Sequence, residues 1–600
     1  MATRRFAVFA VLGFLSGFAA RSGAAEAVPP KDQIQVGRDG MLRSRTGELY
    51  VPLGGLHGNV LPLSRIDLTP EELEKVKPYI WTAQRTDGQG HIDLWDASDA
   101  VMDRWFKQLA ANGVTALRLF PRARVGNEVL DLCGKLNPEL QQVLHRAFKI
   151  ARPYGIRFLL QILPEPGRTG YVSARAIERW VLPRYTQAEL ARLSPAQTRF
   201  IHEKKSVSMK EYFTDPDVLA CQKQYLEQAL DWVAAEPQVF ALEIYNEQGW
   251  NGRQFMYPAE DAEIRWTAEI VRTIKRRLPR MPVTLSHPGF GITGYDPFKW
   301  TRAAGVDFYS PHAYAGLSGE NATIDFAAVA AASSRIMNAV IPSFYGEWGV
   351  FDSPVPMDLK RFSHRDAIWL CLLGGDGGFL QWTNEFLEEY RWPAKVFQAL
   401  PRNFSPERPK LVVKIGAEYE RFHTNSRYPA FKPGEFIGFE LNRQKQQDEN
   451  IQRVFAAYRR SLELGVPIAF TMTGRGMTLD EFALLDAARV QRPIRAEGGY
   501  QLAWLKDARN PLWIAYLRSR KVHGFGSHFI GVPSGAPLAI RLSLPAGRYR
   551  ALLINLSAGE VKAHSVNPDA SIRVSERTSD DYVLIVGAES LRLELPGWAS

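Results

Sequence analysis

Cysteine is scarce in this chain, with only Cys133, Cys221 and Cys371 among 600 residues. The number is odd and no pair has CxxC spacing, which excludes a disulfide framework and a thiolate redox or zinc motif. No cluster of histidine and cysteine indicates a metal either. The sequence therefore predicts buried thiols with at most one disulfide, no metal and no cofactor.

A strong charge of one sign is also missing. The formal net charge is +10, and it falls to +7 once Arg4, Arg5 and Arg21 are assigned to a leader that is removed. This excess is too dilute over so long a chain to indicate a nucleic-acid partner. Repeats and low-complexity tracts are absent, and a hydrophobic content of 46% is typical of an ordinary globular protein.

Long hydrophobic runs are confined to the N-terminus. Two arginines at 4 and 5 precede an apolar run from Phe6 to Ala20, and small residues follow at 22–25. This order is typical of a signal peptide, and the run is shorter than the roughly 20 residues of a membrane span. We expect residues 1–25 to be a signal peptide and the mature protein to be secreted or periplasmic, without membrane contact. An uncleaved anchor is the alternative.

Short apolar runs rich in β-forming residues alternate with helical patterns between residues 51 and 384. Eight alternations predict a (β/α)8 barrel over residues 26–400. A doubly wound open sheet is the alternative, but Gly54–Gly58 lacks the G-x-G-x-x-G spacing that this fold would place after its first strand. The expected strands are Tyr50–Gly54, Val114–Phe120, Ile156–Leu163, Phe240–Asn246, Val283–Ser286, Val306–Ser310, Pro342–Gly346 and Gly378–Trp382.

The pattern changes after Pro401. A strand at Leu411–Ile415, a helix at Asn450–Leu464 and a strand at Gly465–Met472 predict a small α/β domain, flavodoxin-like, over residues 401–495. From residue 496 to 600, short apolar runs separated by turn residues predict an antiparallel β-sandwich. The chain length agrees with several domains.

Two carboxylates directly follow apolar strands of the expected barrel. Glu247 comes after the fourth strand and Glu347 after the seventh. The C-terminal ends of barrel strands converge on one mouth, where catalytic groups lie. Hydrolysis of a glycosidic bond requires two carboxyl groups that face each other across one pocket. Glu247 and Glu347 are therefore the candidate catalytic pair, and a structural salt bridge at a strand end is the alternative.

Other polar and aromatic residues stand at the same end of neighbouring strands. A guanidinium on the second strand is expected to hold Glu347 ionised, and an amide beside Glu247 is suited to a sugar hydroxyl. A histidine and a tyrosine on the sixth strand are suited to orienting the carboxylates, and a tryptophan to stacking on a sugar ring. The candidate substrate-binding residues are Arg118, Asn246, His312, Tyr314 and Trp382. Ordinary core packing is the alternative for His312 and Trp382.

In order and strand by strand, these motifs resemble the clan A retaining glycoside hydrolases over residues 45–400, most of all the cellulase- and mannanase-like enzymes of family 5. The resemblance implies that Glu247 is the acid/base and Glu347 the nucleophile, with the other five residues in support. The chain departs from the family at Gln161, where a histidine is usual, and at Gln248, where proline is common. These departures leave the reaction class intact but not the identity of the sugar.

The middle unit, with its segments at 461–467 and 484–487, faintly resembles the domain that follows the barrel in family 42 β-galactosidases. That likeness allows a homo-oligomer. The expected function is an exported retaining β-glycoside hydrolase that cleaves an oligo- or polysaccharide by double displacement with two glutamates. A non-catalytic carbohydrate-binding barrel and a transglycosylase using the same residues are the alternatives.

Overall fold

The computed structural model describes residues 33–55, 60–62, 66, 68–82, 90–94, 96–120, 136, 138–163, 186–192, 198, 209–248, 260–287, 297–316, 326–351, 357–382, 386–425, 448–519, 538–574, 581–591, 593 and 595. The expected signal peptide at 1–25 and Cys133 lie outside these residues. Cys221 and Cys371 are buried free thiols, as expected. Among the described residues, no helix is both long enough and apolar enough to cross a bilayer.

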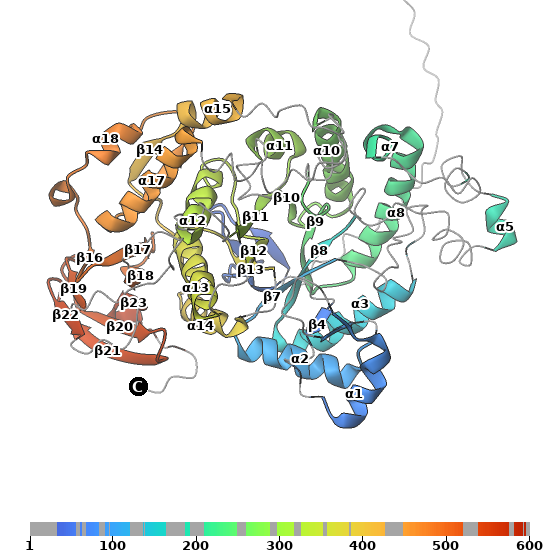
Figure 1. Cartoon of the computed structure of the whole chain (residues 1–600), viewed down its shortest axis with the longest axis horizontal. Coiled ribbons are helices and arrows are strands. Elements are labelled where there is room, and N and C mark those ends of the chain that lie inside the picture. The colour runs from blue at the N-terminus through green and yellow to red at the C-terminus, as the bar shows by residue number, and fades with distance from the viewer. Residues whose placement is uncertain are drawn as a thin grey trace, which may run out of the picture.

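Eight parallel strands form a nearly closed barrel at the centre of the molecule (Figure 1). Around the barrel their order is β12-β11-β10-β9-β8-β7-β3-β13. The barrel closes between β12 and β13. There Tyr345 forms a β-bridge with Phe379, and the Trp382 backbone N–H donates a hydrogen bond to the Trp348 carbonyl. The expected (β/α)8 barrel is confirmed. The strands are β3 Leu53–Gly55, β7 Ala116–Leu119, β8 Arg157–Gln161, β9 Val239–Glu243, β10 Val283–His287, β11 Phe308–Gly316, β12 Glu347–Phe351 and β13 Phe379–Gln381.

Helices surround the strands and bury one apolar face each. They are α2 Asp99–Ala111, α3 Pro138–Ala151, α8 Pro216–Ala234, α10 Glu260–Arg277, α11 Pro297–Ala304, α12 Phe326–Met337, α13 Met357–Leu373 and α14 Arg391–Gln398. Shorter additions are α1 Pro70–Val76, α5 Gln187–Leu190, α7 Met209–Thr214, the hairpin β1 Ile34–Val36 and β2 Leu42–Ser44, and a small sheet of β4 Val60–Pro62, β5 Trp81–Thr82 and β6 Gly90–Asp93.

Helix α2 shows why these elements end where they do. The Ser98 side chain accepts a hydrogen bond from the Val101 N–H and caps the first turn. The helix ends at Ala111, with Asn112 as its C-cap and Gly113 directly after it. Gly113 has φ +83°, and a Cβ there would lie 2.6 Å from the Tyr390 carbonyl oxygen, so this position requires glycine for two separate reasons.

The β1–β2 hairpin covers one end of the barrel interior. Ile34 and Leu42 from the hairpin are buried together with Phe240, Phe308 and Phe344, which come from three different barrel strands or their approaches. The Phe308 and Phe344 rings pack with centroids 4.8 Å apart. This apolar floor leaves the opposite end of the strands for polar residues.

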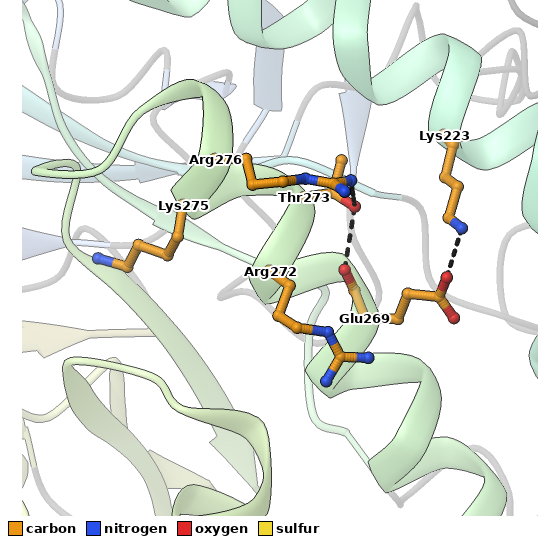
Figure 2. Close-up of a pocket in the computed structure, with 6 residues that line it drawn as sticks. All are labelled: Lys223, Glu269, Arg272, Thr273, Lys275 and Arg276. Atoms are coloured by element: carbon orange, nitrogen blue, oxygen red, sulfur yellow. Dashed lines mark hydrogen bonds and ion pairs between the residues drawn. The ribbon is translucent and has the colours of Figure 1, made fainter. Parts of the chain in front are cut away.

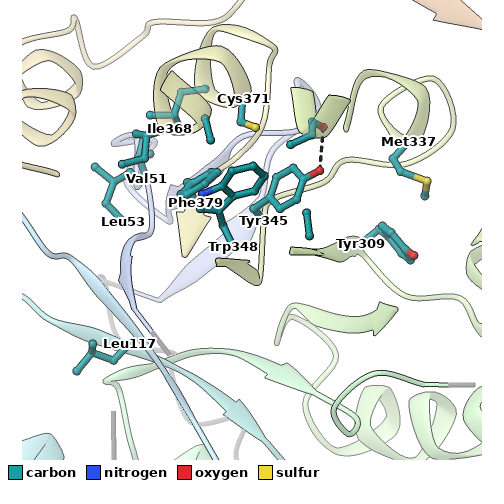
Figure 3. Close-up of a cluster of buried hydrophobic side chains, with 14 of the residues drawn as sticks. Val51, Leu53, Leu117, Tyr309, Met337, Tyr345, Trp348, Ile368, Cys371 and Phe379 are labelled. Carbon is teal, nitrogen blue, oxygen red and sulfur yellow. Dashed lines mark hydrogen bonds between the residues drawn. The ribbon is translucent and has the colours of Figure 1, made fainter. Parts of the chain in front are cut away.

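On the outer side of the strands, aromatic residues pack beneath α12 and α13. Tyr345, Trp348 and Phe379 lie together against Ile368 and Cys371 of α13 (Figure 3). The Tyr345 hydroxyl donates to the Ala330 carbonyl of α12 at 2.8 Å. This layer holds the segment that carries Glu347.

The seventh strand differs from the expectation. Residues 343 and 345 make only isolated bridges, and β12 itself begins at Glu347. Tyr309 pairs with Ser343 whereas His312 pairs with Glu347, so three steps along β11 match four along the seventh segment. One extra residue of this kind is a β-bulge, which reverses the faces to which the following side chains point. The sequence pattern could not reveal it, because nothing in Pro342–Gly346 marks an extra residue.

After the barrel, the described residues form a small unit of two parallel strands and three helices beside α12, followed by two antiparallel sheets that share one apolar core (Figure 1). The small unit comprises β14 Leu411–Lys414, α15 Gly416–Asn425, α17 Glu449–Leu464, β15 Ile468–Thr471 and α18 Leu479–Ala483. The sheets are β16 Ile494–Glu497, β19 Leu538–Leu542 and β22 Ser571–Val574, and β17 Tyr500–Lys506, β18 Leu512–Ser519, β23 Asp581–Ala588, β20 Tyr549–Asn555 and β21 Glu560–Val566.

Helix α13 connects these C-terminal sheets to the barrel through buried ion pairs. Asp366 accepts from Arg518 of β18 at 2.7 Å, and Arg365 lies 2.8 Å from Asp581 of β23. Asp366, Arg518 and Asp581 are almost fully buried. Charges buried this deeply are stabilising only while both partners are present.

We therefore expect Arg518→Leu to reduce the free energy of unfolding by about 3–5 kcal/mol, because it leaves the Asp366 carboxylate buried without its guanidinium. The double variant Arg518→Leu/Asp366→Leu should recover most of that loss. Urea unfolding measures both. Arg541→Leu is the control, because its ion pair with Glu497 is exposed and should contribute no more than about 1 kcal/mol. A double variant as unstable as the single one would contradict this prediction.

Candidate functional site

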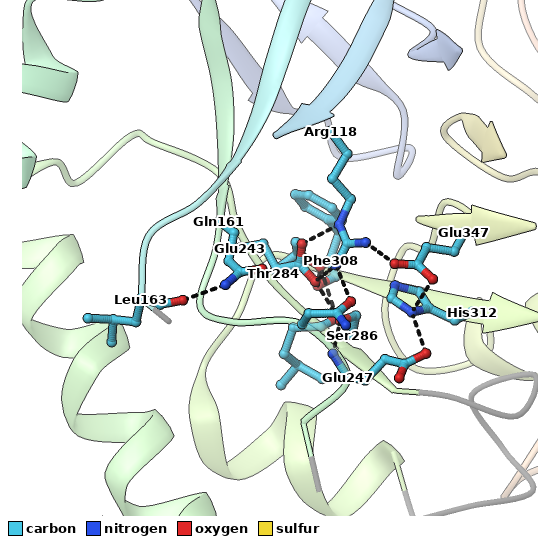
Figure 4. Close-up of polar contacts among 12 residues, drawn as sticks. Arg118, Gln161, Leu163, Glu243, Glu247, Thr284, Ser286, Phe308, His312 and Glu347 are labelled. Carbon is cyan, nitrogen blue, oxygen red and sulfur yellow. Dashed lines mark hydrogen bonds and ion pairs between the residues drawn. The ribbon is translucent and has the colours of Figure 1, made fainter. Parts of the chain in front are cut away.

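Arg118 of β7 lies at the centre of the polar cluster at the C-terminal ends of the strands (Figure 4). Its Nε and Nη2 donate to the two carboxylate oxygens of Glu243 at 2.5 and 2.7 Å. Nη2 also donates to Asn246 Oδ1 at 2.7 Å, and Nη1 donates to Glu347. One fully buried guanidinium thus fixes residues from three strands or strand ends.

The two candidate catalytic carboxylates meet at His312 of β11. His312 Nδ1 lies 3.2 Å from an oxygen of Glu247 and 3.3 Å from an oxygen of Glu347. An oxygen of Glu247 lies within 4.8 Å of one of Glu347. Glu347 is fully buried, while Glu247 remains 7% exposed. The structure therefore brings Arg118, Asn246, Glu247, His312 and Glu347 together, as the sequence analysis expected.

His312 is neutral in this environment. Burial, followed by the charge of Arg118, lowers the pKa of His312 well below 6.5, although Glu243 opposes the shift. A neutral imidazole has one N–H, and two carboxyl groups face Nδ1, so we place the proton on Nδ1 and share it between the two glutamates. Nε2 then has a lone pair and no hydrogen-bond partner among the described residues.

The pKa of Glu347 shifts in the direction opposite to the one expected from its contact with Arg118. Burial raises the pKa of Glu347 well above its usual range, Arg118 lowers it, and Glu247 and Glu243 raise it further. The main physical reason is burial, and a charge imbalance adds to it, because the described cluster holds one guanidinium and three carboxyl groups. The contact with Arg118 exists, but it is shared with Glu243 and does not outweigh burial.

Both glutamines that depart from the family pattern make hydrogen bonds within the fold. Gln161 of β8 donates through Nε2 to the Leu163 carbonyl at 2.6 Å, and its side chain is almost fully buried. The Gln248 side chain donates toward Thr267 of α10 at 3.3 Å. The Gln248 backbone N–H donates to the Ser286 carbonyl at 2.8 Å, a bond that proline could not make.

For two of the expected binding residues, Trp382 and Tyr314, the structure mainly fixes the position of the backbone. Trp382 follows β13 and is half-buried, and its N–H closes the barrel at the Trp348 carbonyl. Tyr314 lies on β11 with its backbone paired to Gly349, but its side chain lies outside what the structure describes. Its expected contact with Glu347 is therefore still a prediction.

The sequence analysis missed Glu243 and Ser286. Glu243 stands inside an otherwise apolar strand, three residues before Asn246, and a lone charge in such a run was a usable signal. Ser286 of β10 is fully buried, accepts the Glu247 N–H at 2.9 Å and donates to Glu243 at 2.5 Å. Nothing in its sequence surroundings distinguishes this serine from an ordinary strand residue.

Within the described part of the chain, Glu247, His312 and Glu347 are the group whose spacing would suit a metal ion. The two distances from His312 Nδ1 are also those of a shared hydrogen bond. A separate hollow of about 410 Å³ lies against α8 and α10 (Figure 2). Its cations include Lys223, which pairs with Glu269, and Lys275, which pairs with Asp307. This hollow is lined by mixed surface charges rather than by a converging set of reactive groups.

Replacing Glu247 with Gln should lower the pKa of Glu347, because it removes a negative charge within 4.8 Å that opposes ionisation. Infrared difference spectra across a pH titration measure this through the protonated carboxyl band that disappears in Glu347→Gln. Glu236→Gln is the control, since Glu236 is a buried carboxyl at the end of α8 that bonds His145 instead. An unchanged or higher midpoint in Glu247→Gln would contradict the prediction.

No family model matches this chain, and no curated protein is similar to it in sequence. The chain is similar to several solved structures. An exo-β-1,4-mannosidase from Opitutaceae bacterium strain TAV5 aligns with a TM-score of 0.46 and 13% identity over 72% of each chain. A family 5 glycoside hydrolase from Bacteroides vulgatus gives 0.43 and 11% over 95% of this chain and 96% of that one.

A β-galactosidase from Rahnella sp. R3 gives a TM-score of 0.41 and 14% identity over 63% of each chain. Family 5 glycoside hydrolases, the family that the strand-end motifs resemble, are thus among the solved structures to which this chain is similar. At these identities the likeness concerns the fold. The chemistry has to come from the residues of the site.

Proposed function

We propose that the protein is a retaining β-glycoside hydrolase that cleaves an oligo- or polysaccharide. The observation that carries this proposal is the pair of carboxyl groups at the barrel mouth, whose oxygens approach within 4.8 Å and share one neutral histidine. Retaining glycosidases hold their two carboxyl groups about 5–5.5 Å apart, whereas inverting enzymes leave about 6.5–9.5 Å for a water. The close approach favours a covalent intermediate.

The two carboxyl groups have different surroundings, which favours different roles. Glu347 is fully buried and fixed by Arg118, as a group must be to approach an anomeric carbon in one geometry. Glu247 reaches solvent and has its carboxyl beside His312. We assign Glu347 as the nucleophile and Glu247 as the acid/base.

The first step then transfers one proton and exchanges one bond. A carboxylate oxygen of Glu347 bonds to the anomeric carbon, the glycosidic C–O bond breaks, and the proton of Glu247 passes to the leaving oxygen. In the second step Glu247 takes a proton from water, the water oxygen bonds to the anomeric carbon, and the ester to Glu347 breaks. The charge imbalance of the cluster favours a bound proton on the Glu247–Glu347 pair before substrate arrives.

The neighbouring groups are suited to binding sugar. The Oδ1 of Asn246 is occupied by Arg118, so the amide NH2 is the part that remains to donate to a substrate hydroxyl. The half-buried indole of Trp382 at the end of β13 offers a stacking surface. A panel of mannan, glucan, xylan and galactan, with the matching aryl β-glycosides, identifies the sugar.

Once the panel has identified a substrate, azide rescue of alanine variants distinguishes the roles of the two glutamates. Glu247→Ala should still form the glycosyl-enzyme from an activated aryl glycoside, and added azide should yield the β-glycosyl azide. Glu347→Ala should form no covalent intermediate, and azide should give the α-glycosyl azide by direct displacement. Proton NMR of the anomeric centre distinguishes the products. A β-azide from Glu347→Ala, or full activity of Glu247→Ala on a natural glycan, would overturn the assignment.

We also propose that the protein is exported, on the evidence of its two N-terminal arginines, apolar run and small residues. Expression of the full chain in a Gram-negative host, followed by intact-mass analysis of the periplasmic fraction, should give a chain that begins near residue 26. Arg4→Glu/Arg5→Glu should retain the unprocessed mass in the cytoplasm. Recovery of the uncleaved chain from the membrane fraction would instead support the anchor alternative.

A further inference from the structure

The backbone of Glu247 adopts an unusual conformation. Its φ is +49°, in the left-handed region, and among the described residues Phe386 is the one other non-glycine with a positive φ. A side chain with a Cβ is disfavoured there, so the surrounding structure must hold it in place. The contacts of the Glu247 backbone show what holds it.

Ser286 of β10 contacts this backbone twice. Its hydroxyl oxygen accepts the Glu247 N–H at 2.9 Å, and its carbonyl accepts the Gln248 N–H at 2.8 Å. The same hydroxyl lies 2.5 Å from a carboxylate oxygen of Glu243. A backbone N–H can only donate, and Glu243 already accepts from Arg118 with both oxygens, so the serine proton points to Glu243.

The result is a continuous chain of hydrogen bonds between the two candidate catalytic residues. It runs from the Glu247 N–H to Ser286, from Ser286 to Glu243, and from Arg118 to both Glu243 and Glu347. Removing the Ser286 hydroxyl would leave a buried N–H and a carboxylate lone pair unsatisfied. Hydrogen bonds in such buried networks reinforce one another.

We propose that Ser286 is the positioning residue for the acid/base, holding Glu247 in the left-handed conformation that directs its carboxyl toward His312 and Glu347. Ser286 is fully buried and acts only through Glu247 and Glu243, not on the substrate. The effect of Ser286 on reaction rates rests on the proposed glycosidase function. Its effect on the conformation of Glu247 does not depend on that function.

The kinetic test compares leaving groups. In Ser286→Ala, kcat/KM for an unactivated oligosaccharide should fall roughly 10- to 100-fold, because a displaced general acid protonates the leaving oxygen poorly. For a 2,4-dinitrophenyl β-glycoside of the same sugar, which needs little protonation, kcat/KM should change by less than about threefold. An equal loss on both substrates, or no loss on either, overturns the proposal.

Two further variants serve as a control and as a substitute for Ser286→Ala. Ser310→Ala is the matched control, since Ser310 is the register partner of Ser286 on β11, equally buried, and its hydroxyl has no hydrogen-bond partner among the described residues. It should leave both kcat/KM values unchanged. Ser286→Cys keeps the volume but bonds weakly, so it should show the same dependence on leaving group if Ser286→Ala does not fold.

A crystal structure of Ser286→Ala, or of Ser286→Cys, gives a readout that does not depend on activity. We expect φ of Glu247 to leave the left-handed region, or its carboxyl to move beyond hydrogen-bonding distance of His312 Nδ1. An unmoved Glu247 overturns the positioning role. If the wild-type protein cleaves no glycoside, the proposed function fails, and this structure still decides the role of Ser286.

Discussion

The buried guanidinium of Arg118 is the interaction on which the rest of the site depends. It lies fully inside the barrel and donates to Glu243, Asn246 and Glu347. Glu243 and Glu347 raise the pKa of Arg118 more than burial lowers it, so the group stays charged. A buried cation of this kind requires carboxylates around it, and those carboxylates require the cation. The guanidinium and the carboxylates around it therefore depend on each other.

Among the described residues, the site carries three carboxyl groups, Glu243, Glu247 and Glu347, but only the one guanidinium of Arg118. Glu243 neutralises Arg118 and holds it in place by two hydrogen bonds, which leaves Glu247 and Glu347 to share what remains. Burial and the two neighbouring carboxyl groups raise the pKa of Glu347, so a proton bound within this pair is favoured. A pair that holds one proton is what acid/base chemistry across a cleft needs. An excess of carboxyl groups would destabilise a purely structural ion pair, but it suits the two-glutamate chemistry proposed above.

Much of this arrangement was readable from the sequence, because strand ends of a parallel barrel converge. Apolar runs of four to eight residues located the strands, and the carboxylates after two of them located the site. Three features were not readable. No residue in the segment before Glu347 marks the bulge, and the left-handed φ of Glu247 has no glycine to mark it. The direction of the Glu347 pKa shift depends first on how deeply its carboxyl is buried, which strand-end position alone does not reveal.

The pairing of β3 with β13 sets an order on how the barrel is made. Leu53 pairs with Phe379, so the wall is completed by residues more than 300 positions apart in the chain. Synthesis at about 5–20 residues per second separates the appearance of these two strands by roughly 15 to 65 seconds. Until then the edge of β3 toward β13 has no partner strand, and non-local parallel pairings of this kind form slowly. Wherever the chain folds, β3 therefore keeps one open edge until β13 reaches it, and an open strand edge is a site at which chains aggregate.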